Sequence, residues 1–186
     1  GGAAAIDGAP LLLVRTDELP APAAAQLDRL DPGHIVVLGG TAAVGSGAAC
    51  VADIDNDGRP DIYFCGGTGT LCRNLGKLRF EDWTKKMPPN KHARSQAAAF
   101  GDVDGDGHVD LYVTNYEDWK DNTYTFPDLL LRNREGKGFE PWWEAKGDQV
   151  LPGRGVTFFD ADEDGKPEIY VSNYRLAPNF LWFFDP

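Results

Sequence analysis

Short apolar runs separated by turn-forming residues occupy the chain from residue 48 to its end. Three of these runs, at 48–52, 97–100 and 156–159, each lead directly into an acidic segment. A further apolar run follows each acidic segment, and Gly or Pro residues stand between successive runs. Such spacing is typical of short β-strands joined by tight turns. The pattern therefore predicts a mainly β fold.

The three acidic segments, here called loops 1, 2 and 3, share one design. Carboxylates stand at positions 1, 3, 5 and 9, Gly stands at position 6, and a hydrophobic–Tyr–hydrophobic triplet follows. The carboxylates are Asp53, Asp55, Asp57 and Asp61 in loop 1, Asp102, Asp104, Asp106 and Asp110 in loop 2, and Asp160, Asp162, Asp164 and Glu168 in loop 3. Position 7 is Arg59, His108 or Lys166. This recurrence indicates a repeat architecture.

The residues after each loop predict the rest of a four-stranded unit. Later strands are expected at 71–74, 130–133 and 180–182, and the first two copies add a strand around Phe80 and Phe139. Four-stranded units in series are typical of a β-propeller, with one unit per blade. We expect blades at about 47–96, 97–154 and 155–186, within a propeller domain at 47–186. A polar and aromatic insertion at 116–127 lengthens the second blade, and the third blade lacks its last strand.

About three blades cannot close a ring of the usual size, roughly four to eight blades. The fold expected is therefore a partial β-propeller of about three four-stranded blades. Such a chain is a piece of a longer propeller or closes by assembly.

The loop spacing favours calcium as a ligand. Gly at position 6 allows the sharp turn that folds the carboxylates inward. Carboxylates held so close repel one another unless a cation lies among them. Calcium accepts oxygen ligands in a flexible geometry, whereas magnesium prefers a tight octahedron with retained water. We expect about three calcium ions, each held by the carboxylates of one loop and the backbone carbonyl of position 7. The alternative is a set of solvated acidic turns, and Glu168 makes loop 3 the least regular copy.

An EF-hand begins in a similar way but requires a bidentate Glu at position 12 and flanking helices. Position 12 is Phe64, Val113 or Val171, and each belongs to an expected strand. The loops are therefore predicted to join the strands of β-hairpins.

Residues 48–186 resemble the FG-GAP/VCBS repeats of integrin-type propellers and many bacterial surface proteins. The core Asp-x-Asp-x-Asp-Gly-x-x-Asp-hydrophobic-Tyr carries the resemblance. It implies calcium in the hairpin loop of each blade and an extracellular or cell-surface location. It implies no particular enzyme activity.

The first 46 residues show a different pattern of apolar and polar positions. They predict a strand at 9–14, a helix at 19–30 and a strand at 34–38, which is a short β-α-β segment with parallel strands. The runs at 8–14, 19–20 and 36–44 resemble the second half of a type 2 cell-wall-binding repeat, which implies noncovalent anchoring to wall polymers. The alternative is an appendage that covers the edge of the first blade.

The net charge and the length of the apolar runs exclude some classes of partner, whereas the cysteines leave two alternatives open. Eighteen basic residues against 29 acidic ones give a net charge of −11, which argues against nucleic acid and anionic membrane surfaces. No apolar run is long enough to span a membrane. Cys50, Cys65 and Cys72 leave the redox state open, because Cys65 could bridge to either of the others or all could be buried thiols.

Catalytic motifs such as Gly-x-Ser-x-Gly and His-Glu-x-x-His do not occur, so no catalytic residue is assigned. Several aromatic residues could form a surface that binds protein or polysaccharide, or could pack between blades: Tyr116, Trp119, Tyr124, Phe126, Trp142, Trp143 and Tyr174. The preferred hypothesis is a calcium-binding, non-enzymatic module for adhesion or structure at the cell surface. The alternative is an accessory propeller scaffold of a polysaccharide-acting enzyme, which would need a cleft with paired carboxylates outside the loops.

Overall fold

A computed structural model describes residues 4–6, 9–11, 49–92, 94–118 and 124–184 of the chain. Three antiparallel sheets follow one another along the sequence. The first contains β3 (Ala49–Ala52), β4 (Asp61–Phe64), β5 (Thr70–Gly76) and β6 (Arg79–Asp82). The second contains β7 (Ser95–Gly101), β8 (Asp110–Asn115), β9 (Leu129–Asn133) and β10 (Phe139–Glu144). The third contains β11 (Gly153–Phe159), β12 (Glu168–Asn173) and β13 (Phe180–Trp182).

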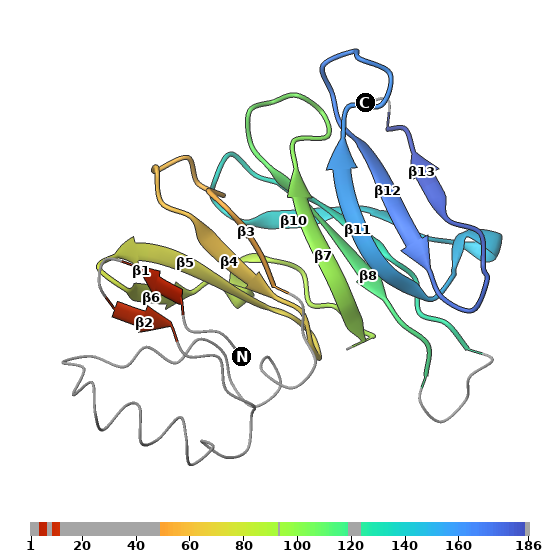
Figure 1. The fold of residues 1–186 in the computed structure, drawn as a ribbon, viewed down its shortest axis with the longest axis horizontal. Coiled ribbons are helices and arrows are strands. Elements are labelled where there is room, and N and C mark those ends of the chain that lie inside the picture. Colours follow the sequence, from red (N-terminus) through yellow and green to blue (C-terminus); the bar gives the residue numbers. More distant parts are fainter. Residues whose placement is uncertain (1–3, 7–8, 12–48, 93, 119–123, 185–186) are drawn as a thin grey trace.

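Within each sheet every strand pairs with the next one in sequence, so each sheet is a simple up-and-down meander. The sheets, here called blades 1, 2 and 3, stand beside one another with β3, β7 and β11 roughly aligned (Figure 1). The predicted mainly β fold and partial propeller are confirmed, since the sheets have four, four and three strands. Among the described residues, the only helices are the single-turn 3-10 segments η1 (Thr84–Lys86) and η2 (Gly147–Gln149). None of the described helices has the length or apolar character needed to cross a membrane.

The apolar core lies between blades. Tyr63, Leu71 and Trp83 of blade 1 pack with Leu111 and Leu131 of blade 2 in one cluster. These side chains alternate along their strands with residues that face the other side, as the pleat of a strand requires. Burial of the shared faces is what joins neighbouring blades into one structure.

A second cluster joins blades 2 and 3. Tyr112 and Leu130 pack there with Ile169 and Val171. Phe158 of blade 3 lies so close to Gly101 of β7 that a Cβ built on this glycine would stand 2.3 Å from the phenylalanine ring. A glycine at this point lets the two strands approach each other.

The described part of the first 46 residues is a hairpin of β1 (Ala4–Ile6) and β2 (Ala9–Leu11), which pair antiparallel. β2 coincides with the start of the strand predicted at 9–14, but its antiparallel partner was not predicted. The helix predicted at 19–30 and the strand at 34–38 lie outside the described residues. The wall-anchoring hypothesis therefore stays a prediction.

The three cysteines are free thiols, which resolves the alternative left open by their spacing. Cys65 is buried in the first core cluster, and Cys50 packs against that cluster. Burial raises the pKa of the Cys65 thiol to about 12, so this sulfur stays protonated at neutral pH. The cysteines act here as small apolar core residues.

Candidate metal centres in the hairpin loops

The three acidic loops are the β3–β4, β7–β8 and β11–β12 connections. All three project from the same end of their blades, at the top of Figure 1. Position 12 of each loop, at Phe64, Val113 or Val171, lies inside β4, β8 or β12. The loops therefore join antiparallel strands and have no flanking helices, as the sequence predicted.

Each loop turns through two residues with positive φ. Position 6 is Gly58, Gly107 or Gly165, with φ of 83°, 87° and 90°. Glycine adopts this conformation without steric cost, whereas other L-residues do not. Position 4 is also left-handed, and loop 3 places a glutamate there, Glu163, with φ of 64°. Loop 3 therefore carries more backbone strain than a loop with Gly at this position.

The first aspartate organises each turn. Asp102 accepts hydrogen bonds from the backbone N–H groups of Asp106 and Gly107, at 3.1 and 2.9 Å. Asp53 and Asp160 make the equivalent bonds in loops 1 and 3. These bonds hold the position-1 carboxylate over the concave side of the turn, where the other carboxylates converge.

The acidic residue at position 9 is buried beneath the loop. Asp110 accepts a hydrogen bond from the N–H of Val103 at 3.1 Å and from the N–H of Asn133 at 2.9 Å. Asp61 accepts equivalent bonds from Ile54 and Asn74, at 2.9 and 2.7 Å. Glu168 accepts the equivalent of the first bond, from Ala161 at 2.6 Å, and no equivalent of the second is present among the described residues.

Burial and the nearby aspartates Asp104 and Asp106 raise the pKa of Asp110 to about 6, although its backbone hydrogen bonds oppose the rise. The pKa of Asp61 is raised in the same way, chiefly by burial. Negative charge at this position is costly, and a bound cation would offset that cost.

The predicted ligands converge in all three loops, but with different membership. Carboxylate oxygens within 4.8 Å of one another are provided by Asp53, Asp55 and Asp57 in loop 1, by Asp102, Asp104 and Asp110 in loop 2, and by Asp160, Asp162 and Glu168 in loop 3. Loop 1 thus leaves Asp61 outside its cluster, and loops 2 and 3 leave out Asp106 and Asp164. Each cluster supplies at least three hard oxygen ligands, the kind that calcium prefers.

At position 7, the side chains of Arg59 and His108 contact neighbouring groups. Arg59 forms an ion pair with Asp57, and its Nε donates to the carbonyl of Asn74 at 2.9 Å. His108 Nδ1 lies 3.1 Å from the side-chain amide nitrogen of Asn56 in loop 1. Loop-to-loop packing, which spacing within one loop does not reveal, decides this contact. Among the described residues, the side chain of Lys166 forms no hydrogen bond or ion pair, and its role as a backbone ligand stays a prediction.

Two asparagines that were not among the predicted site residues support the loops from the neighbouring strand. Besides its backbone bond to Asp61, Asn74 donates from its side chain to the carbonyl of Pro60 at 2.9 Å. Asn133 makes the matching bonds to Asp110 and to the carbonyl of Val109. The recurrence of Arg-Asn at the end of β5 and β9 was the available signal.

The arginine before each asparagine points at the carboxylates. Arg73 forms ion pairs with Asp55 and Asp57, and Arg132 forms one with Asp104. A basic group therefore sits against the acidic cluster in blades 1 and 2.

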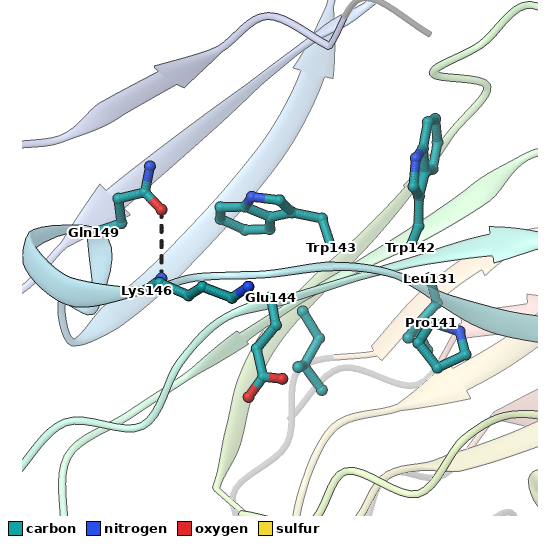
Figure 2. Close-up of a pocket in the computed structure, with 8 residues that line it drawn as sticks. Leu131, Pro141, Trp142, Trp143, Glu144, Lys146 and Gln149 are labelled. Atoms are coloured by element: carbon teal, nitrogen blue, oxygen red, sulfur yellow. Dashed lines mark hydrogen bonds between the residues drawn. The ribbon is translucent and has the colours of Figure 1, made fainter.

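The aromatic candidates divide between packing and surface roles. Trp143 packs on Trp182 and Tyr112, with ring centroids 5.3 and 6.2 Å apart, so it belongs to the interface of blades 2 and 3. The register shifts between Pro141 and Trp143, and the side chains of Trp142 and Trp143 both point to the same side of β10 (Figure 2). A bulge of this kind reorients one side chain relative to the regular alternation.

The insertion at 116–127 also joins the two blades. The guanidinium of Arg154 packs against the rings of both Tyr116 and Tyr174, 4.5 and 4.4 Å from their centroids. Tyr124 packs edge-on against Phe126 and remains about half exposed. Trp119 lies outside the described residues. The ligand-binding role of this surface stays a prediction.

A pocket of about 330 Å³ lies along β9 and β10, lined in part by Trp142, Trp143 and Lys146 (Figure 2). Glu144 is the one carboxylate in its lining. Glycoside hydrolysis usually requires two carboxyl groups across the scissile bond. The pocket therefore does not provide the pair that the polysaccharide-enzyme alternative requires.

The fold and the repeated loop define this chain as part of a β-propeller, and residues 53–113 match the family model of the FG-GAP-like repeat. That stretch, from loop 1 to most of β8, is an FG-GAP repeat segment. The chain is also similar to cartilage acidic protein 1 of Mus musculus, with 28% identity over 158 residues. The match covers 73% of this chain and 24% of the relative, so the chain spans about a quarter of that protein's length.

Proposed function

We propose that the chain is a calcium-binding module of an extracellular or cell-surface protein, with a structural or adhesive role and no catalytic activity of its own. The carrying observation is the repetition of one acidic cluster at the same hairpin of three successive blades, each with carboxylate oxygens within 4.8 Å of one another. Carboxylates repel one another at such distances, so their convergence in three loops favours a cation among them.

The ligands proposed are the carboxylates of positions 1, 3, 5 and 9 and the carbonyl oxygen of position 7. Aspartates outside the three-residue clusters can join when a cation draws the loop together, because calcium tolerates variable coordination geometry. Calcium would supply the positive charge that offsets burial of Asp61 and Asp110 and would crosslink the two strands of each hairpin.

The extracellular assignment is supported by the FG-GAP repeat match and by the name of the mouse relative, a cartilage protein. Sites in extracellular modules bind calcium with dissociation constants of about 0.1–1 mM. At roughly millimolar calcium, such affinities stabilise the folded state by about 0.4–1.4 kcal/mol per site. Three sites together would form a large share of the stability of a small domain.

The test is thermal unfolding of the chain in millimolar calcium, in millimolar magnesium and in excess chelator. We expect a higher Tm in calcium than in either other condition. Isothermal titration with calcium chloride should give about three sites per chain. Identical melting curves in all three conditions and no binding heat would refute the proposal.

The proposed partner is a protein or polysaccharide at the cell surface, bound through the insertion at 116–127, where Tyr124 is about half exposed. Loops on a rigid scaffold commonly carry binding specificity. Glycan and matrix-protein arrays probed with the wild-type chain and with Tyr124→Ser would test this role. Binding that is equal for both proteins would place the partner elsewhere.

A further inference from the structure

An arginine of blade 1 and an arginine of blade 2 each contact carboxylates of the acidic cluster in the same blade. The guanidinium of Arg73 contacts Asp55 and, at 3.0 Å, Asp57, and both carboxylates belong to the loop 1 cluster. Arg132 contacts Asp104, which belongs to the loop 2 cluster. A guanidinium and a calcium ion cannot both take full advantage of the same carboxylate oxygens.

Each arginine is held in place by a tryptophan. The guanidinium carbon of Arg73 lies 5.1 Å from the ring of Trp83, and that of Arg132 lies 5.4 Å from the ring of Trp142. The two tryptophans are equivalent, because each follows the residue that pairs with the position before the arginine. Stacking on an aromatic ring orients the planar guanidinium towards its carboxylate. The Arg–Trp pair is therefore a repeated feature of the blades.

The carboxylates concerned are buried. The side chains of Asp55 and Asp104 are only 8% and 4% exposed. Among the described residues, Asp55 Oδ1 has no hydrogen-bond partner, whereas Asp104 Oδ2 is the oxygen that forms the ion pair with Arg132. A buried oxygen without a hydrogen bond is costly, and a bound cation would satisfy it.

Blade 3 offers an internal comparison. Ile169 pairs with Trp182 as Ile62 pairs with Cys72, so Phe183 stands at the position of Arg73 and Arg132. Phe183 is 59% exposed. Within the described residues, no lysine or arginine forms an ion pair with the acids of loop 3. Loop 3 therefore has the cluster without the arginine.

We infer that Arg73 and Arg132 are built-in counter-cations of loops 1 and 2. Each stabilises its loop when calcium is scarce and must yield its carboxylate when calcium binds, so each lowers the calcium affinity of its own loop. This inference rests on the proposed function. It predicts that the first two blades remain folded over a range of low calcium concentrations that would otherwise destabilise them.

The experiment is calcium titration by calorimetry, together with the melting temperature in chelator, for Arg73→Gln and Arg132→Gln. Each variant should tighten one calcium site by about thirty-fold, the effect of one unit charge about 4 Å from a divalent cation in a water-like dielectric. Each should also lower the Tm in chelator. A purely structural arginine would lower the Tm without improving affinity, so opposite changes in the two quantities identify the counter-cation role.

Arg134→Gln is the matched control, since Arg134 pairs with Glu140 outside the loops and its loss changes the net charge by the same amount. It should leave calcium affinity unchanged. Phe183→Arg gives an independent gain-of-function test on an exposed residue, and it should weaken the loop 3 site. Should the glutamine variants fail to fold, this substitution still decides the inference.

Unchanged or weaker calcium binding in the glutamine variants, with wild-type binding intact, would overturn the inference and leave the proposed function standing. An unchanged loop 3 affinity in Phe183→Arg would do the same. A wild-type chain that shows neither binding heat nor a calcium-dependent Tm would overturn both.

Discussion

The side-chain amide of Asn133 in blade 2 donates a hydrogen bond to the backbone carbonyl of Ile54 in loop 1, at 2.9 Å across 79 residues of sequence. The same amide group donates to the carbonyl of Val109 in loop 2 at 3.0 Å. One buried side chain thus ties the loops of two adjacent blades together. Asn56 adds a second link, because its amide donates to the carbonyl of Gly107 at 3.0 Å.

Replacement of Asn133 by Ala is expected to destabilise the fold by about 1–3 kcal/mol, because buried carbonyls lose their donor. It should also weaken calcium binding at loops 1 and 2 together. Asn74→Ala is the matched control, since Asn74 makes its equivalent side-chain bonds within blade 1 only. Denaturant unfolding of the two variants provides the measurement. Equal losses of stability would show that the link between blades contributes nothing.

Asp104→Ala should lower calcium affinity and Tm together. The substitution removes one carboxylate of the loop 2 cluster and leaves Arg132 without its partner. Thermal unfolding in calcium and in chelator separates the loss of a calcium ligand from the loss of the ion pair with Arg132. The difference in Tm between the two conditions should shrink by about the contribution of one site. Asp148→Ala removes the same charge from an exposed position outside the loops and serves as control. A full calcium response in Asp104→Ala would exclude loop 2 as a site.

Asp128 should make stability depend on pH. Its carboxylate accepts hydrogen bonds from the N–H of Asn115 and the hydroxyl of Tyr112, yet burial dominates and raises its pKa to about 7. The folded state then holds this proton more tightly than the unfolded state, whose aspartate pKa is about 4. Stability contributed by the protonated group is therefore lost as the pH rises from about 4 to 7.

The equivalent position in blade 3 suggests a variant that tests the pH dependence expected from Asp128. Asn179 accepts a hydrogen bond from the N–H of Asn173 and donates one to the hydroxyl of Tyr170. In blade 3 an uncharged amide therefore contacts the same two kinds of partner that Asp128 contacts in blade 2. We expect Asp128→Asn to remove the loss of stability between pH 4 and 7, measured as the difference in unfolding free energy from wild type. Asn179→Asp, at an exposed site, should add little pH dependence. A difference that does not change with pH would show that Asp128 keeps an ordinary pKa.

Gly153→Ala should disrupt the contact between blades 2 and 3. A Cβ at Gly153 would lie 2.6 Å from Cβ of Thr114 and 3.1 Å from a carboxylate oxygen of Asp128. Overpacking of this kind typically costs about 1–3 kcal/mol. Gly155→Ala is the control on the same strand, since its nearest neighbour is the rotatable hydroxyl of Ser172. Thermal unfolding should rank Gly153→Ala below Gly155→Ala, and the reverse order would contradict the packing argument.

The sequence predicted strands and turns correctly where these depend on residues close together in the chain. The strands expected at 71–74, 130–133 and 180–182 are present as parts of β5, β9 and β13. Period-two alternation and turn residues act over a few neighbours, so they can be recognised in a single stretch of chain. The same holds for Gly58, Gly107 and Gly165, which were expected to allow a sharp turn and adopt positive φ in the structure.

Contacts between distant residues were not predictable in this way. Spacing identified Asp55 and Asp104 as candidate ligands but not the arginines that face them, since Arg73 and Arg132 come from another strand of the blade. Nor did it foresee that Asp61 lies outside the loop 1 cluster while Asp110 belongs to that of loop 2.

The sequence by itself determined the strands, the turns and the repeated acidic loops, because these depend on residues close together in the chain. Only the tertiary structure decided which carboxylates converge, which arginine opposes them, and that Asn133 joins two blades. These features depend on strand register and on the packing of one blade against the next. Both are set by burial of apolar faces from residues far apart in the chain.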